Sequence, residues 1–501
     1  MRVVQNPQMQ IGEVDITQIK FDPKCRDDIP KILKGLQYLY MNIPLRTQIF
    51  QLLEAEISPK VSKSNGRPGM ELWKIFVCGV VRLDLNEDYD RLHDLVNKHS
   101  DIRKMLGHGT FDNEYYHYQT LVDNVSLLTP ELLDRINQVV VSAGHVLVKK
   151  KDGEALRGRC DSFVVETDVH YPTDINLLYD AMRKVITLIA QWCDEHDISD
   201  WRQHAYNVRH IKRLMRSAQN KRRSKAKSEE QQKKNEILIV KAHQEYLDVA
   251  GSYLNKAQGT ISKLVQQGFT SEFDILKKME IEGFMQHATR QIDQTERRVI
   301  HGEVIPHDEK VFSIFEPHTE WISKGKAGVP VELGVKVCIL EDQHQFILHH
   351  QVMEKKTDDQ VAVTMVKEAK KRFLKLTACS FDKGFHSPEN QIALKEQLEQ
   401  VVLPRKGKLS KQAQAAEQTQ PFIEARHAHS AVESAINALE VHGLDRCPDH
   451  GINGFKRYVA LAVVARNIHR IGDILYKQEQ ERAQRKMKKS SGCSPPLKLV
   501  A

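Results

Sequence analysis

Residues 158–171 read GRCDSFVVETDVHY, and the pattern of the chain changes here. β-Branched and aromatic residues alternate roughly with polar ones, which is typical of a strand or a tight hairpin. Residues 70–145 before this stretch show repeated helical periodicity, and long helical patterns return from Asn176 to about Val299. The stretch therefore predicts the first strand of a sheet, placed between two helical segments.

Further strands are predicted downstream at KVFSIFE (310–316), VELGVKVCIL (331–340), QFILHHQVM (345–353), LKLTACSFD (374–382) and VVLP (401–404). Helices are predicted at 359–373, from Ser387 onward, at about 423–441 and at 455–476. This order predicts an α/β fold with a mixed sheet, a helical N-terminal domain and a large helical insertion. Ligands of such sheets collect outside the carboxyl ends of the strands.

The composition narrows the class of protein. A chain of 501 residues has room for two or three domains, and no apolar run is long enough to span a membrane. The first residues lack the apolar core and cleavage site of a secretory signal, and the 8 cysteines include no CxxC pair. We therefore expect a cytoplasmic protein with reduced thiols, associated with the nucleoid if it binds DNA.

The formal net charge of +8 is less informative than its placement. Residues 202–227 contain no acid, and a helix with a basic face is predicted there. Basic side chains on such a face can replace the counterions of a phosphate backbone; the alternative is an ordinary solvated helix. The DNA-binding candidates on this helix are Arg209, Lys212, Arg213, Arg216, Arg222 and Arg223.

Three acids stand where an α/β sheet could bring them together. Asp161 lies in the first predicted strand, Asp382 ends the strand 374–382, and Glu433 lies on the helix after the last strand. Carboxylates are the ligands that Mg²⁺ prefers, and two such ions can serve an in-line phosphoryl displacement. The trio therefore forms a candidate site for two Mg²⁺ ions, with Mn²⁺ as a substitute.

Each acid also has a purely structural interpretation. Asp168 and Asp174 compete with Asp161, although Asp174 suits the N-cap of the helix that follows. Asp382 precedes a Lys-Gly turn, and Glu433 stands three residues after Ser430, as in a capping box. Glu440, seven residues later on the same helix face, is a substitute for Glu433.

Several motifs resemble one family. DSFVVETDVHYPTDINLL (161–178) resembles the first catalytic strand of bacterial insertion-sequence transposases of the DDE type, and its first residue matches their first Asp. FDKGFHSPEN (381–390) resembles their second motif, which maps to Asp382, and the stretch from His429 to Gly472 resembles the third, which maps to Glu433. IPHDEKVFSIFEPHTEWISKGKAG (305–328) is similar to the ISNCY group, and NGRPGMELWKIFVCGVV (65–81) is similar to the helical domain that precedes such cores.

The resemblance implies a ribonuclease-H-like core at 151–475 with a basic helical insertion at about 176–299. It implies a DNA-binding-type helical domain at 61–150, after an N-terminal segment at 1–60. The basic composition of residues 476–501 predicts a disordered tail. The resemblance also implies metal-dependent cleavage of double-stranded DNA at inverted-repeat ends, transfer of the freed strand to target DNA, and a homo-oligomer that joins two ends. The alternatives are a nuclease without strand transfer and an inactive DNA-binding protein.

One departure concerns the surroundings of the third acid. Many relatives carry a Tyr, an Arg four residues before the Glu and a Lys seven after it, where this chain has Arg426, His429 and Glu440. Lys383, Arg426 and His429 are therefore candidates for contacts with DNA phosphate. Rings that could stack on an unpaired base are Tyr171, Trp321 and Phe385, with ordinary packing as the alternative.

Overall fold

A computed structural model describes residues 2–491 except 7, 10–11, 23–24, 58–68, 111, 149–153, 224–227, 324–329 and 408–409. The side chains of residues 57, 223, 412–413 and 486–491 also lie outside the described part. The chain divides into two compact units. Unit 1 comprises Met1–Asp168 and Ile322–Ala501, and unit 2 comprises Val169–Trp321.

A mixed sheet forms the centre of unit 1. Its strands are β1 (Leu156–Thr167), β2 (Glu320–Ser323), β3 (Val331–Glu341), β4 (Ile347–Met353), β5 (Leu376–Phe381), β6 (Gln400–Val402) and β7 (Arg446–Cys447). The order is β2-β3-β1-β5-β6, with β4 beside β3 and β7 beside β1. β1 is antiparallel to β3 and parallel to β5, so the sheet is mixed as the sequence predicts.

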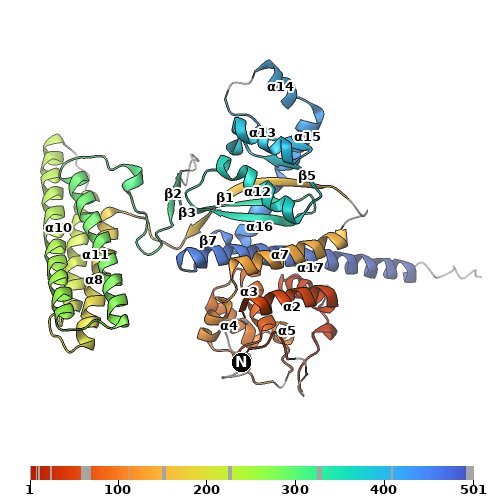
Figure 1. Ribbon diagram of the computed structural model, residues 1–501, viewed down its shortest axis with the longest axis horizontal. Helices are drawn as coiled ribbons and strands as arrows, with labels where there is room; N and C mark the ends of the chain where they lie inside the picture. The colour runs from red at the N-terminus through yellow and green to blue at the C-terminus, as the bar shows by residue number, and fades with distance from the viewer. Residues whose placement is uncertain are drawn as a thin grey trace, which may run out of the picture. The chain divides into compact units, whose positions relative to one another are not determined.

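Helices cover the sheet on both faces (Figure 1). α12 (Asp358–Arg372) and α13 (Pro388–Gln397) lie over one face, and α7 (Pro130–Val148) and α16 (Ala431–Leu439) lie over the other. α14 (Lys411–Glu417) and α15 (Gln420–His429) follow β6. This arrangement is a ribonuclease-H-like α/β core with added helical regions.

The N-terminal helices share one hydrophobic core with the sheet. They are α1 (Ile29–Met41), α2 (Ile43–Ile57), α3 (Leu72–Asp84), α4 (Tyr89–Lys98), α5 (Ser100–Met105) and α6 (Tyr118–Val125), after the short 3₁₀ helix η1 (Ile16–Gln18). α17 (Gly451–Ser491) packs against α1, α3 and α7. One cluster of buried hydrophobic side chains therefore includes residues from Ile16 near the N-terminus to Ile471 on α17.

Unit 2 is a helical bundle with a hydrophobic core of its own. Its helices are α8 (Asp174–Glu195), α9 (His204–Arg223), α10 (Glu229–Gln266) and α11 (Glu272–Val299), followed by the 3₁₀ helix η3 (His307–Glu309). Each of the four helices packs against at least two of the others. The described part of the chain contains no helix that is both long and apolar enough to cross a membrane.

Three of the predicted elements differ in the structure. Residues 310–316 are not a strand: the Ser313 hydroxyl accepts hydrogen bonds from the backbone N–H groups of Phe315 and Glu316 and holds a turn. The helix predicted at 423–441 is divided at Ser430 into α15 and α16. The last helix is longer than predicted and continues through the expected tail to Ser491.

Candidate active site

Parallel pairing of β1 and β5 brings the first two acids together. Cys160 on β1 is paired with Phe381 on β5, so the next residues along the two strands are Asp161 and Asp382. Asp382 occupies the N-cap position of the 3₁₀ helix η4 (Lys383–Phe385), but its side chain makes no capping hydrogen bond. Its exposed carboxylate is therefore not used by the turn.

Glu433 is presented by α16, which packs against β1. Ser430 precedes this helix, but its hydroxyl donates to the carbonyl of His427 at 2.8 Å and makes no capping bond. The capping box that the sequence allowed is therefore absent at this helix start, and the Glu433 side chain is exposed.

The electrostatics of Asp161 join the three acids in one site. Burial raises the pKa of Asp161 to about 6, against the Ser162 backbone N–H, which donates to the carboxylate at 2.8 Å. Negative charge on Asp382, Asp358 and Glu433 contributes to this raised pKa. The carboxylates of a turn and of a helix thus act on the carboxylate of Asp161 in the middle of β1.

Asp358 is a fourth carboxylate here, and sequence reasoning missed it. It starts α12, accepts a hydrogen bond from the Ser162 hydroxyl at 2.7 Å and forms an ion pair with Lys336 of β3 at 3.2 Å. A side chain at Gly384 would come within 2.9 Å of its carboxylate. The only sequence signal was its place at a helix start, where acids are common. Asp358 therefore joins β1 and β3 beside the turn that carries Asp382.

His429, the last residue of α15, contacts the strand that leads to Asp382. Its Nδ1 is 3.0 Å from the hydroxyl of Ser380 on β5. The pKa of His429 is lowered, chiefly by burial and also by the positive charge of Arg159. The negative charges of Asp382 and Glu433 oppose this change. His429 therefore interacts electrostatically with two of the three acids, Asp382 and Glu433.

Arg159 is a second residue that sequence reasoning missed. Its guanidinium forms an ion pair with Glu341 at 2.9 Å and donates to the carbonyl of Asp342 at 2.7 Å. It thereby places a fixed positive charge two residues before Asp161.

The competing acids have other contacts. Asp168 is exposed and lies 3.7 Å from Arg446. Asp174 is the first residue of α8 and forms an ion pair with Arg298 at 2.7 Å, while the cap is Thr173, whose hydroxyl accepts from Asn176 N. The prediction that Asp174 is the N-cap is therefore wrong by one residue.

The acidic site suits a hard divalent cation. Its ligands would be carboxylate oxygens, and their mutual repulsion would be relieved by positive charge. Among the described residues, two groups have all their ligand atoms within 4.8 Å of one another. One is Asp84 with His442 and His469, and the other is His108 with Asp112 and Glu114. The three acids do not form such a group. Two ions about 3.5–4 Å apart need a wider set of ligands than one ion does.

The basic candidates on α9 are mostly exposed. Arg209, Arg213, Arg216 and Arg222 are open to solvent, whereas Lys212 is half-buried, 5.8 Å from the centre of the Tyr179 ring. The side chain of Arg223 lies outside the described part. Ile211, Leu214 and Met215 are buried on the opposite face, as the helical spacing predicts.

The other candidates near the acids divide into two classes. Lys383 and Arg426 are exposed, the first directly after Asp382 and the second on α15. Phe385 is buried and packs against Phe381 with ring centroids 5.6 Å apart, so the suggestion that it stacks on a base is wrong. Tyr171 and Trp321 lie in unit 2 and retain exposed surface.

Comparison with protein families identifies a domain in the C-terminal part of the chain. Residues 301–468 match the family model described as Transposase DDE domain, which includes Asp382 and Glu433 and begins after Asp161. Neither the curated proteins nor the solved structures contain a match. The matched region, together with the mixed sheet and its acids, shows that the chain carries a transposase domain of the DDE type.

Proposed function

We propose that this transposase cleaves the ends of an insertion sequence and joins the freed strand to target DNA. The observation that carries the proposal is the shared electrostatic site of Asp161, Asp382 and Glu433, which come from three separate elements. Three carboxylates that the chain gathers against their own repulsion are a costly arrangement unless positive charge joins them.

The three acids would hold two Mg²⁺ ions. When bound, such ions stabilise the charge on the attacking and leaving oxygens of a phosphoryl transfer. The remaining work is done by the chain: the Ser162 backbone N–H donates to the Asp161 carboxylate, and the Ser162 hydroxyl ties the middle of β1 to Asp358 at the start of α12. Exposed Lys383 and Arg426 would contact the phosphates on either side of the scissile bond.

Other parts of the molecule would hold the DNA. The exposed arginines of α9 suit the backbone of the element's ends, and the helical domain at 61–150 would add further contacts. Joining two ends requires at least two active sites, so we propose a homo-oligomer acting on cytoplasmic DNA. Membership of the ISNCY group remains a prediction that rests on the sequence at 305–328.

A cleavage and strand-transfer assay tests the proposal. Labelled duplexes carrying the DNA that flanks each end of the coding region are incubated with the full chain, Mg²⁺ and a target plasmid. Nicked ends and joined products are expected. Cleavage without joined products would favour the nuclease, and binding without either product would favour the inactive DNA-binding protein.

Asp382→Asn is the informative variant. Because the Asp382 side chain makes no capping bond and is exposed, the variant is expected to fold and bind DNA normally while cleavage is lost. Asp90→Asn, a change at an exposed acid on α4, is the matched control and should retain activity. Normal cleavage by Asp382→Asn would refute the assignment of this acid.

A further inference from the structure

A cavity of about 710 Å³ lies in unit 2, between the start of α8, the ends of α9 and α11 and the segment around η3. Its volume is within the range of small-molecule sites, about 300–1,000 Å³. None of the three acids of the active site lines it. The proposed function therefore leaves the cavity unexplained.

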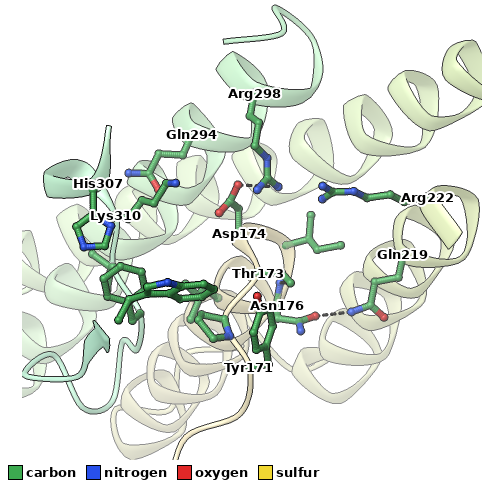
Figure 2. Close-up of a pocket in the computed structure, with 16 residues that line it drawn as sticks. Tyr171, Thr173, Asp174, Asn176, Gln219, Arg222, Gln294, Arg298, His307 and Lys310 are labelled. Carbon is green, nitrogen blue, oxygen red and sulfur yellow. Dashed lines mark hydrogen bonds and ion pairs between the residues drawn. The ribbon is translucent and has the colours of Figure 1, made fainter. Parts of the chain in front are cut away.

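The cavity is strongly basic on one side. The described residues that line it include three basic side chains, Arg222, Arg298 and Lys310, and a single carboxylate, Asp174. Figure 2 shows Arg298 and Arg222 extending from different helices toward the same space beside Asp174. Asp174 is 2.7 Å from Arg298, which leaves Arg222 without an ion pair among the described side chains.

Arg298 is incompletely satisfied in this position. Its Nε is buried and has no hydrogen-bond partner among the described residues. Burial lowers the pKa of Arg298, and the positive charge of Arg222 also lowers it. The negative charge of Asp174 opposes both effects. An anion with several oxygens, such as phosphate, would accept a hydrogen bond from the buried donor. Its negative charge would also offset the repulsion between the two guanidinium groups.

Three aromatic rings form part of the cavity wall. Tyr171 and Trp321 meet edge to face with centroids 5.6 Å apart, and Phe312 lies 5.7 Å from Trp321. The Tyr171 side chain is 61% exposed, so part of its ring surface is open. The amide of Gln219 donates to the amide oxygen of Asn176, and the remaining polar atoms of the two amides are of the kind that pair with base edges.

We propose that this cavity binds one nucleotide, with its phosphate between Arg222 and Arg298 and its base against Tyr171 and Trp321. The ligand chemistry is a nucleobase joined to a phosphate. It can come from a free nucleotide or from an unpaired position in a DNA strand. A base within a duplex is stacked on both faces and cannot enter.

Tryptophan fluorescence gives a direct readout in the full chain. Of the 4 tryptophans, Trp73, Trp192 and Trp201 are at most 1% exposed, whereas Trp321 is half-buried in the cavity wall. Wild-type protein is titrated with deoxyadenosine monophosphate, with deoxyadenosine and with a short single strand. Saturable quenching is expected with the monophosphate or the single strand, and weaker binding with the nucleoside. Tighter binding of the monophosphate would identify a free nucleotide as the ligand, and tighter binding of the single strand would identify an unpaired position in DNA.

Two variants separate the phosphate and base contacts. Tyr171→Ala should weaken binding about 5- to 150-fold, the range for losing one stacked base, and Arg222→Gln should weaken binding of phosphate-bearing ligands alone. The controls are Tyr206→Ala and Lys233→Gln, exposed positions in unit 2 that do not line the cavity. Absence of quenching, equal affinity for the nucleoside and monophosphate, or wild-type affinity in Arg222→Gln would overturn the proposal. None of these measurements requires DNA cleavage, so they are independent of the proposed activity.

Discussion

Asp161 shows how a residue suited to metal chemistry weakens the fold that carries it. Its carboxylate is half-buried and repelled by Asp382, Asp358 and Glu433, and one backbone N–H of Ser162 offsets only part of this. Sites that gather like charges therefore reduce stability in return for function.

The first prediction follows from this repulsion. Asp161→Asn removes one charge and keeps the shape, so at neutral pH with a chelator it should raise the free energy of unfolding by about 1–3 kcal/mol. Calorimetry measures the change, with Asp90→Asn expected to alter it by less than about 0.5 kcal/mol. Mg²⁺ should then stabilise the wild type more than Asp161→Asn. A variant less stable than wild type without metal would contradict the argument.

The second prediction concerns the buried pair of His469 and Asp84, which joins α17 to α3 at 3.0 Å. Burial lowers the pKa of His469, but Asp84, with help from Asp473 and Asp28, raises it above the usual value. A histidine with a raised pKa stabilises the fold fully below about pH 6.5, its unfolded value, and loses this contribution as the pH rises through its folded value.

His469→Gln should therefore cost more stability at pH 6 than at pH 9, with a loss of about 3–5 kcal/mol at the lower pH, because a buried charge loses its partner. Thermal unfolding at both pH values measures the difference. His301→Gln, at an exposed position, is the control and should leave the pH dependence of the wild type unchanged. An equal loss at both pH values would show that His469 is not charged in the folded state.

At the scale of elements, the sequence predicts periodicity well and terminations poorly. The strand predicted at 310–316 is instead a turn, because Ser313 accepts two backbone N–H groups and Ile314 packs into the core of the helical bundle. The helix predicted at 423–441 divides where Ser430 donates to the carbonyl of His427. Such local hydrogen bonds compete with regular structure and leave no periodic signal.

The final helix differs for the opposite reason. Residues 477–491, beyond Tyr476, contain no glycine or proline, and the ion pair of Arg485 with Glu481 at 3.6 Å supports their helix. A basic composition suggested a frayed tail, but helix propensity favours continuation.

The third prediction belongs to α9. Its exposed arginines are separated from a buried apolar stripe, so changing Arg209, Arg213 and Arg216 together to Gln should preserve the helix and weaken DNA binding. Each lost phosphate contact should lower the slope of log K against log salt by about 0.9. Binding to a labelled duplex at several salt concentrations measures this, with a Lys233→Gln and Lys241→Gln double variant on α10 as control. An unchanged slope would mean that this face does not contact DNA.

For the candidate site, spacing alone left several acids in competition. The resemblance selected Asp161, Asp382 and Glu433, and their electrostatic contact in the structure supports the choice without testing their role. Asp358 and Arg159 could not be predicted, since their importance depends on contacts with Ser162 and Glu341 that are far apart in the sequence.

At the scale of the whole molecule, separate hydrophobic cores predict separate unfolding. The core of unit 1 extends from the N-terminal helices through the sheet to α17, and unit 2 has its own. Gly35 on α1 and Gly472 on α17 allow the two helices to touch: a Cβ at Gly35 would lie 2.3 Å from the carbonyl oxygen of Ile468. The N-terminal helices are therefore part of the catalytic unit's core.

Gly35→Ala tests this organisation. The added methyl group meets backbone that cannot move aside, so it should destabilise unit 1 by about 1–3 kcal/mol or more. Calorimetry of the full chain should show two transitions, with the one for unit 1 shifted down and the one for unit 2 unchanged. Gly251→Ala on α10, where a Cβ meets open space, is the control and should shift neither transition downward. A parallel shift of both transitions in Gly35→Ala would mean that the two units unfold as one.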